Sequence, residues 1–388
     1  MEDYKDKYKN HKAKYLRLIN NDDAQLGGKN NKYNVDNFDN KMNELIEKID
    51  SNYGLLITAN NKIIYEKYVG RPKVTLCQEG NNSKTRFRIF SCSKPVTAMA
   101  IIILAQMKKI KLTDTIDKFC INVPHNDVIT INHLLYHTSG VYDFSSELYF
   151  KLNPKKLFDK ILGEYETKFV DFETHVQEIN KNEPYFTPLK KSHDFDFKNY
   201  NNTGYDILGY IIYCASGMKT DEFIRKNIFN KLNMKNSGFQ HEKHENESIP
   251  YENNKKQAIK EQQNWFCGNA YIVCTLRDYN KYLSNYEKLL EPKYLEMYKK
   301  LYFFGKINKN NKDYNYFVHR GAGDFRRQHS IGKEEYYPLS RTTAMKFFNE
   351  DKNVNVIVSE NYPTNNGFFA HGQKNWNLII ENIMDMKL

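Results

Sequence analysis

The sequence predicts an α+β fold, in which an antiparallel sheet is flanked by terminal and internal helices and carries a mostly helical insert lobe. Segments typical of strands lie near both ends of the chain, at residues 54–68 and 314–359, whereas residues 113–263 are mostly helical with loops between the helices. At 388 residues the chain can bury a substantial core in one large domain or two closely packed lobes. We therefore expect both ends of the chain to complete one sheet.

This pattern divides the chain into a tail and two lobes. Residues 1–37 form a polar, basic N-terminal tail, residues 38–112 and 264–388 form an α/β lobe, and residues 113–263 form a mostly helical lobe. The tail is rich in lysine, asparagine and aspartate, so we expect it to be solvated. A contact between the tail and an acidic surface is the alternative.

The α/β lobe is predicted to begin with a helix and a hairpin. Apolar residues repeat at helical spacing over residues 38–49, and Asp39 or Asn40 can serve as the N-cap. Residues 54–59 and 62–68 are apolar and β-branched and are separated by two asparagines. This arrangement predicts two strands joined by a tight turn.

The end of the chain returns to strands. Residues 314–319, 342–348 and 354–359 alternate or run apolar with β-branched and aromatic side chains, which favours strands. The last helix is expected to carry Trp376 and Ile380 on the face that packs against the sheet.

Composition excludes a membrane-spanning protein. Hydrophobic residues make up 40% of the chain and charged residues 27%, as in a globular protein. No run approaches the ~20 apolar residues that span a bilayer. No apolar segment follows the N-terminal lysines as it would in a signal peptide. We therefore expect no membrane span and a cytoplasmic or virion-associated location.

Charge and cysteine usage argue against two further kinds of site. The net charge of +11 is spread thinly along the chain and no nucleic-acid-binding motif accompanies it, so nucleic acid is not the expected partner. The six cysteines show no C-x-x-C pair and no metal-finger spacing. Free thiols in a reduced compartment are the expected state.

The strongest chemical signal is Ser91-Cys92-Ser93-Lys94, at the start of a long apolar helix expected from Ser91 to about Ile110. A spacing of three puts Ser91 and Lys94 on one helical face, so the ammonium can neighbour the hydroxyl. A serine hydroxyl is unreactive unless a nearby group takes its proton or stabilises its anion. Ser91 is therefore the candidate nucleophile and Lys94 its catalytic partner.

The same spacing occurs twice more, at Ser216 to Lys219 and at Ser330 to Lys333. Neither copy opens a long apolar helix. We therefore assign no catalytic role to them.

A second motif is Tyr200-Asn201-Asn202, which precedes an apolar helical stretch. A tyrosinate near a lysine can act as a general base, and an asparagine side chain can orient both the lysine and a substrate carbonyl. Tyr200 is thus a candidate catalytic residue and Asn202 a candidate substrate-binding residue. Because the chain has 29 tyrosines, a helix cap rich in tyrosine and asparagine is the alternative interpretation.

A third motif is His319-Arg320-Gly321, the one H-x-G among 11 histidines, at the expected end of an aromatic strand. Glycine would let a substrate backbone approach closely. A surface histidine before a glycine turn is the alternative interpretation.

Together the three motifs resemble those of the penicillin-recognising serine hydrolases, the superfamily of class C β-lactamases, DD-peptidases and esterases. The segment Phe87 to Thr97 closely resembles the nucleophile segment of that superfamily. The resemblance covers residues from about 50 to 362, firmly at the motifs and loosely between 141 and 198.

The resemblance implies a two-step acyl transfer on a small-molecule or peptide substrate, with no metal or organic cofactor. Ser91 would attack an amide, lactam or ester carbonyl, and water activated near Tyr200 would hydrolyse the acyl-enzyme. The backbone N–H groups of Ser91 and Ala322 would form the oxyanion hole, and His319 and Gly321 would line the substrate site.

His319 stands where many members of the superfamily carry lysine, although its esterases and peptidases also use histidine. An imidazole has an ordinary pKa of ~6.5. We therefore expect hydrolysis of anionic substrates to strengthen as the pH falls toward 6, unless Arg320, Arg326 or Arg327 supplies the charge.

Two other functions stay open. The first is a catalytically weak β-lactamase-like fold used as a binding or virion component, and the second is a basic, tail-mediated interaction protein.

His133 and His137 lie four residues apart and could join a third ligand in a metal site, but packing, with helix capping by Gly140, is the expected role. Sequence does not fix the substrate or the oligomeric state.

Overall fold

The structure is a computed structural model of the chain. It describes residues 40, 42–44, 52–70, 80–143, 172–189, 199–248, 251–252, 255–256, 268–309, 312–330, 333–349 and 353–361. For residues 174, 251–252, 255–256, 303–309, 312, 322–330, 333–340 and 361 the description is limited to the backbone. The predicted tail at 1–37 and the predicted last helix around Trp376 lie outside the described residues. The helix expected at 38–49 is described at residues 40 and 42–44, which are helical.

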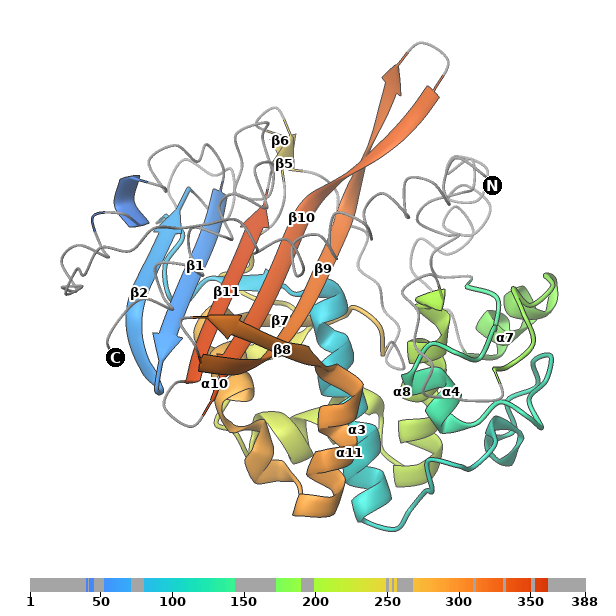
Figure 1. Cartoon of the computed structure of the whole chain (residues 1–388). Helices are drawn as coiled ribbons and strands as arrows, with labels where there is room; N and C mark the ends of the chain where they lie inside the picture. Colours follow the sequence, from blue (N-terminus) through green and yellow to red (C-terminus); the bar gives the residue numbers. More distant parts are fainter. Residues whose placement is uncertain are drawn as a thin grey trace.

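An antiparallel sheet of six strands forms the centre of the fold, in the order β2-β1-β11-β10-β9-β8 (Figure 1). The N-terminal strand β1 pairs with the late strand β11, so both ends of the chain complete one sheet. This arrangement confirms the predicted α+β fold. The strands are β1 (Asn52–Ala59), β2 (Lys62–Val69), β8 (Phe303–Lys309), β9 (Lys312–Ser330), β10 (Lys333–Phe348) and β11 (Asn353–Asn361).

The tight turn between β1 and β2 forms at the two asparagines, as predicted. Asn60 and Asn61 have φ angles of 48° and 65°, in the left-handed region that asparagine enters more readily than most residues. Ala59 then pairs with Lys62 across the turn. The turn thus fixes the register of the hairpin.

Strands β9 and β10 are longer than predicted. The expected strand end at His319 is wrong, because β9 continues through Gly321 to Ser330. Cross-strand pairing explains the extension: Gly321 lies opposite Thr342, and the ladder continues until Ser330 lies opposite Lys333. The hairpin therefore projects beyond the rest of the sheet (Figure 1).

A second, three-stranded sheet was not predicted. Its order is β3-β7-β4, with both outer strands antiparallel to β7. Its strands are short, so they carry little alternation for a sequence pattern to reveal. They are β3 (Arg86–Arg88), β4 (Ser237–Phe239) and β7 (Ile272–Thr275), and a separate pair consists of β5 (Tyr251–Glu252) and β6 (Lys255–Lys256).

The helices of the described chain include none that is long and apolar enough to cross a membrane. Besides the helical residues 40 and 42–44, they are η1 (Phe90–Ser93), α3 (Lys94–Gln106), η2 (Ile116–Phe119), α4 (Ile131–Leu135), α7 (Phe172–Asn180), α8 (Thr203–Ser216), α9 (Thr220–Ile224), η5 (Arg225–Phe229), α10 (Leu276–Asn285), η6 (Tyr286–Leu289) and α11 (Pro292–Tyr302).

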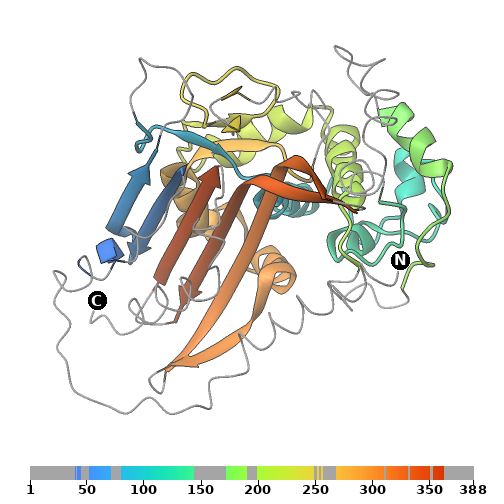
Figure 2. The same cartoon turned by 90° about the horizontal axis from the view of Figure 1, so that it is seen from above.

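The two faces of the six-stranded sheet bury different clusters. Leu56 and Ala344 belong to the core shared with the helices, whereas their neighbours Leu55 and Met345 belong to a smaller core that includes Met42. This division follows from the alternation of side chains along a strand. Figure 2 shows helices α3 and α10 against one face of the sheet.

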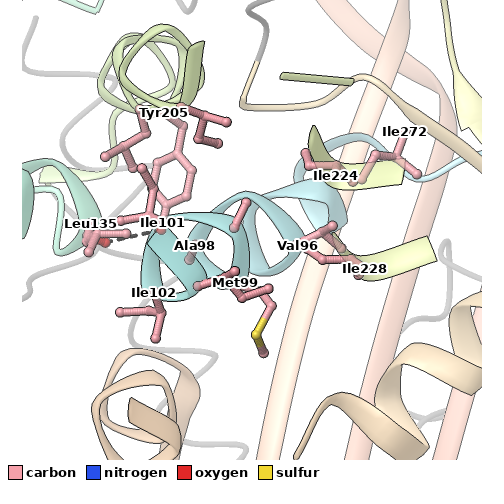
Figure 3. Close-up of a cluster of buried hydrophobic side chains, with 14 of the residues drawn as sticks. Val96, Ala98, Met99, Ile101, Ile102, Leu135, Tyr205, Ile224, Ile228 and Ile272 are labelled. Carbon is pink, nitrogen blue, oxygen red and sulfur yellow. Dashed lines mark hydrogen bonds between the residues drawn. The ribbon is translucent and has the colours of Figure 1, made fainter. Parts of the chain in front are cut away.

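Helix α3 is the centre of the larger core, and every residue from Lys94 to Ala105 is buried. Figure 3 shows its side chains surrounded by residues of several other elements, among them Leu135, Tyr205 and Ile224. The helix ends before the predicted Ile110, because the chain passes into the left-handed region at Lys108, with φ 58°.

This burial predicts a large cost for truncating α3. Ile102 is 0% exposed, so Ile102→Ala should lower the free energy of unfolding by ~2–5 kcal/mol through lost burial and a residual cavity. The matched control is Met107→Ala just beyond the helix, where 46% exposure predicts a change within ~0.5 kcal/mol. Urea unfolding monitored by circular dichroism measures both, and equal effects would contradict a central role for α3.

Candidate active site

Ser91 and Lys94 meet at the junction of η1 and α3. Ser91 is half-buried in the 3₁₀ turn, and Lys94, the first residue of α3, is fully buried. A 3₁₀ turn has three residues per turn and so brings residues i and i+3 into line. The ammonium of Lys94 accordingly donates a hydrogen bond to Oγ of Ser91 over 3.0 Å.

The backbone around Ser91 is tightly constrained. Phe90 is buried and has a φ of 46°, a conformation that bulky residues rarely adopt and that recurs at functional sites. On the other side, a Cβ on Gly321 would lie 2.3 Å from the carbonyl oxygen of Ile89 and 2.9 Å from the nitrogen of Ser91. Strand β9 can approach the nucleophile turn this closely because position 321 is glycine.

Lys94 is held by three acceptors. Besides Ser91, its Nζ donates to Oδ1 of Asn202 over 2.6 Å and to the carbonyl oxygen of Asn269 over 3.0 Å. These bonds match the three hydrogens of an ammonium group. Nζ also lies 4.8 Å from the ring centroid of Tyr200. The structure therefore brings the first two sequence motifs together.

Tyr200 is supported from behind by a buried histidine. The ring of His137 lies 4.6 Å from that of Tyr200, and its Nδ1 accepts a hydrogen bond from the N–H of Asn201 over 3.0 Å. Burial, with smaller contributions from Lys94 and His319, lowers the pKa of His137 well below its ordinary value. The ring is therefore neutral near pH 7.

A carboxylate orients the start of α8. Oδ1 of Asp143 accepts hydrogen bonds from the N–H groups of Asn202 and Thr203, over 3.1 and 3.0 Å. A carboxylate is favourable at a helix N-terminus, where N–H groups lack partners within the helix. This cap from a distant loop holds Asn202 in place to contact Lys94.

Tyr200 is a neutral phenol in this site. Burial raises its pKa well above the ordinary value, and a hydrogen bond between Tyr200 and Ser91 opposes that effect. The tyrosinate expected from the sequence is therefore disfavoured in the resting protein. A proton relay through Tyr200 must begin from its protonated form.

His319 lies on β9 near the same cluster, its ring 6.1 Å from that of Tyr302. Burial and the nearby charge of Lys94 lower the pKa of His319 to about 3. A neutral imidazole at pH 6 disfavours the expected gain of charge there, and the pH dependence expected for anionic substrates stays a prediction. A contact of 3.2 Å between its Nδ1 and the carbonyl oxygen of Arg320 favours the tautomer with hydrogen on Nδ1.

Ala322 follows Gly321 in β9 and lies opposite Arg341 in the ladder with β10. The structure describes the backbone there. That the backbone N–H of Ala322 is the second hydrogen-bond donor of the oxyanion hole stays a prediction.

The first further S-x-x-K copy begins at the last residue of α8, and the serine and lysine of the second lie in β9 and β10. Oγ of Ser216 accepts a hydrogen bond from the N–H of Met218 in the turn that ends α8, and Lys219 precedes α9. Ser330 and Lys333 lie opposite each other where β9 and β10 meet at the far end of their hairpin.

His133 and His137 serve helix packing and capping. Nδ1 of His133 accepts from the N–H of Thr130 over 2.9 Å in a capping box at the start of α4. Within the described residues, no group of three His, Cys, Asp or Glu side chains could hold a metal ion.

Four residues were not recognised from the sequence as parts of this site. The sequence pattern indicates a packing role for His137, and nothing in it marks His137 as a support for Tyr200. Asp143, Asn269 and Asp206, whose carboxylate accepts a hydrogen bond from the side chain of Asn269, had no motif to mark them, because their contacts span long stretches of chain. The one local signal is Gly268-Asn269, a glycine and a polar residue in an otherwise apolar approach to β7.

Comparison with known proteins places these motifs in a family. The sequence model of the family described as Beta-lactamase matches residues 44–372. Penicillin-binding protein 4* of Bacillus subtilis (strain 168) is 30% identical over 188 residues, which are 47% of this chain and 37% of that protein. Protein flp of Staphylococcus aureus (strain MW2) is 27% identical over 247 residues, 59% of this chain and 44% of that protein. The chain thus spans less than half the length of these relatives.

Solved structures share the fold. The octameric penicillin-binding protein homologue from Pyrococcus abyssi superposes with a TM-score of 0.60 at 22% identity, covering 87% of this chain and 76% of that one. The D-amino acid amidase from Ochrobactrum anthropi SV3 superposes with a TM-score of 0.61 at 17% identity, covering 90% and 99%. At these identities the likeness shows the fold.

The lowered pKa of His319 predicts a pH dependence of stability. Because the folded pKa is about 3 and the unfolded value ~6.5, the unfolded chain binds the extra proton between these values, and stability falls as the pH drops. His319→Gln should lower the slope of the unfolding free energy against pH by up to ~1.4 kcal/mol per unit between pH 4 and 6.

Urea unfolding at pH 7, 6, 5 and 4 measures this slope. His137 and His175 also have lowered pKa values, but both remain in the variant, so the difference between the two proteins reports on His319. If the unfolding free energies of the two proteins changed with pH in parallel, His319 would titrate alike in the folded and unfolded states.

Proposed function

The chain belongs to the beta-lactamase family, and from this premise we propose that it hydrolyses an amide, lactam or ester through an acyl-enzyme on Ser91. The observation that carries the proposal is the hydrogen bond of 3.0 Å between the buried Nζ of Lys94 and Oγ of Ser91. A hydroxyl held against a desolvated lysine is the arrangement that activates a serine nucleophile.

Acylation forms a bond between Oγ of Ser91 and the substrate carbonyl carbon. Lys94 is an ammonium in the resting site, and in the fraction of the protein in which it has released that proton to solvent the amine takes the proton of Ser91. The neutral phenol of Tyr200 gives its proton to the leaving group and receives one from Lys94. Lys94 and Tyr200 thus end the step in the protonation states in which they began it. The oxyanion is stabilised by backbone N–H groups, for which we propose those of Ser91 and Ala322.

Deacylation reverses these roles. Water takes the place of the leaving group and gives a proton to the Tyr200 and Lys94 pair as it attacks the acyl carbonyl, and Ser91 recovers its proton when the ester bond breaks. Asn202 contacts Lys94 in the resting site and is proposed to hold the acyl group during both steps.

The charge of the site supports amide or ester substrates that need no carboxylate beside His319. That imidazole is neutral, so a substrate carboxylate would gain no ion pair from it. The shared fold with a D-amino acid amidase supports an amide as substrate. Among the three motifs, the exposed Arg320 is the remaining cation that an anionic substrate could meet.

Covalent labelling tests the nucleophile. Exposure to penicillin, an activated ester or a fluorophosphonate should add the mass of one adduct, and Ser91→Ala should abolish it. The fold should persist, because removing a half-buried hydroxyl at a helix start costs at most ~1–2 kcal/mol. Intact-mass spectrometry measures the adduct, and peptide mapping locates it.

Ser216→Ala is the matched control and should label like the natural protein. An adduct that survives in Ser91→Ala and disappears in Ser216→Ala would move the nucleophile to that copy. A folded protein that accepts none of the probes would support the binding or virion component instead.

A second test concerns Lys94 and Tyr200, which the relay joins as one unit. Lys94→Met and Tyr200→Phe should each slow acylation by ~10²–10⁴-fold, and the double variant should be no slower than the worse single variant. Quenched-flow measurement of adduct formation gives the three rates. If the fold-decrease in acylation rate of the double variant equals the product of the two single decreases, the two groups act independently.

A further inference from the structure

The segment that leads into β7 joins the two helices of the active site. The carbonyl oxygen of Gly268 accepts a hydrogen bond from Oγ1 of Thr97 on α3 over 2.7 Å, and its N–H donates to Oδ1 of Asp206 on α8 over 3.1 Å. A Cβ on Gly268 would lie 1.9 Å from the carbonyl oxygen of Tyr205. Glycine at this position therefore lets the segment fit between the helices.

The next residue connects a buried carboxylate to the catalytic lysine. The carbonyl oxygen of Asn269 accepts from Nζ of Lys94 over 3.0 Å, and its side-chain Nδ2 lies 2.7 Å from each carboxylate oxygen of Asp206. All three side chains are buried, with Asp206 2% exposed and Asn269 5% exposed. One residue thus separates the carboxylate from the ammonium.

This arrangement affects Lys94 in two ways. The bonds from Asp206 fix the side chain and the backbone of Asn269, and so fix the acceptor that aims Lys94 at Ser91. A buried negative charge also favours the charged form of a neighbouring lysine, and the interior strengthens this effect by its low dielectric.

Other titratable groups also face this region. The imidazole of His175 on α7 lies 4.0 Å from Oδ2 of Asp206. Burial lowers the pKa of His175, as it does for His137 and His319, so all three rings are neutral near pH 7. Further titratable groups among the described residues include Tyr200 and Tyr205 next to Lys94, Cys92 within reach of the charges of Lys94 and Arg320, and Asp143 at the N–H of Asn202.

We propose that Asp206 is a positioning residue for the active site, which acts through Asn269 to aim Lys94 and to stabilise its ammonium form. Its effect on acylation rests on the proposed function, whereas its effect on the titration of Lys94 does not. A residue that served the fold alone would change stability without moving that titration.

The direct test is the titration of Lys94, followed by NMR of the ¹³Cε signal in protein labelled at lysine and assigned with Lys94→Met. Asp206→Asn removes the charge and keeps the shape, so the titration midpoint of Lys94 should fall by about one pH unit. An unchanged midpoint in folded Asp206→Asn protein would overturn the proposal.

A matched control is Asp278→Asn, which removes another buried carboxylate from a helix start. Asp278 accepts hydrogen bonds from Asn236 and Lys281 and none from Lys94. The midpoint of Lys94 should stay within ~0.3 pH units in this variant. Equal shifts in both variants would show a general effect of charge and would count against Asp206 as a specific positioning residue.

Adduct formation at Ser91 then measures the catalytic consequence. On the plateau of the pH–rate profile, where Lys94 is an amine in both proteins, Asp206→Asn should slow acylation by ~10–100-fold through lost positioning, and the acid limb should move to lower pH. In an Asn269→Gly background, which removes the connecting amide but keeps the carbonyl, the same substitution should have a smaller effect on the rate.

The outcomes separate the two proposals. If the natural protein accepts no probe at Ser91 but the midpoint of Lys94 still falls in Asp206→Asn, the proposed function fails and the positioning role stands. If acylation proceeds and Asp206→Asn changes neither the midpoint nor the acid limb, the positioning role fails and the proposed function stands.

Discussion

The burial of one ammonium group determines how this active site is built. Lys94 is 0% exposed, and removing a charge from water costs several kcal/mol unless its hydrogens find partners. The three acceptors come from three parts of the chain: Ser91 before α3, Asn202 before α8, and Asn269 before β7. Because Lys94 needs all three hydrogen bonds, these three elements are held in one relative position. The same bonds place the nucleophile.

The groups around Lys94 are tuned toward their neutral forms. Burial lowers the pKa of His137 and His319 and raises that of Tyr200, and the charge of Lys94 adds to the shift of both histidines. Because these three groups are neutral, they add little charge that would oppose the movement of a proton between Lys94 and Tyr200. The same tuning removes the charge selection that a lysine at position 319 would supply.

Local patterns in the sequence predicted the parts of the site that depend on spacing, and long-range contacts supplied the rest. The contact between Ser91 and Lys94 follows from their spacing of three residues on one helical turn, and the β1–β2 turn follows from two consecutive asparagines. The extension of β9 past Gly321 could not be predicted, because glycine commonly ends strands and the pairing with β10 that overrides this tendency is not local. Likewise, the link from Asp206 to Asn269 joins residues 63 positions apart.

The position of the nucleophile resolves two opposing demands. A catalytic serine must meet a substrate that arrives from solvent, whereas the lysine that activates it works best where water is excluded. The interior of a core helix offers no access, and an exposed helix offers no desolvation. The first turn of α3 satisfies both demands, because Ser91 is half-buried at the edge of the core and Lys94, one turn later, is completely buried. The strained backbone at Phe90 and the close approach of Gly321 are consequences of placing a reactive group at that boundary.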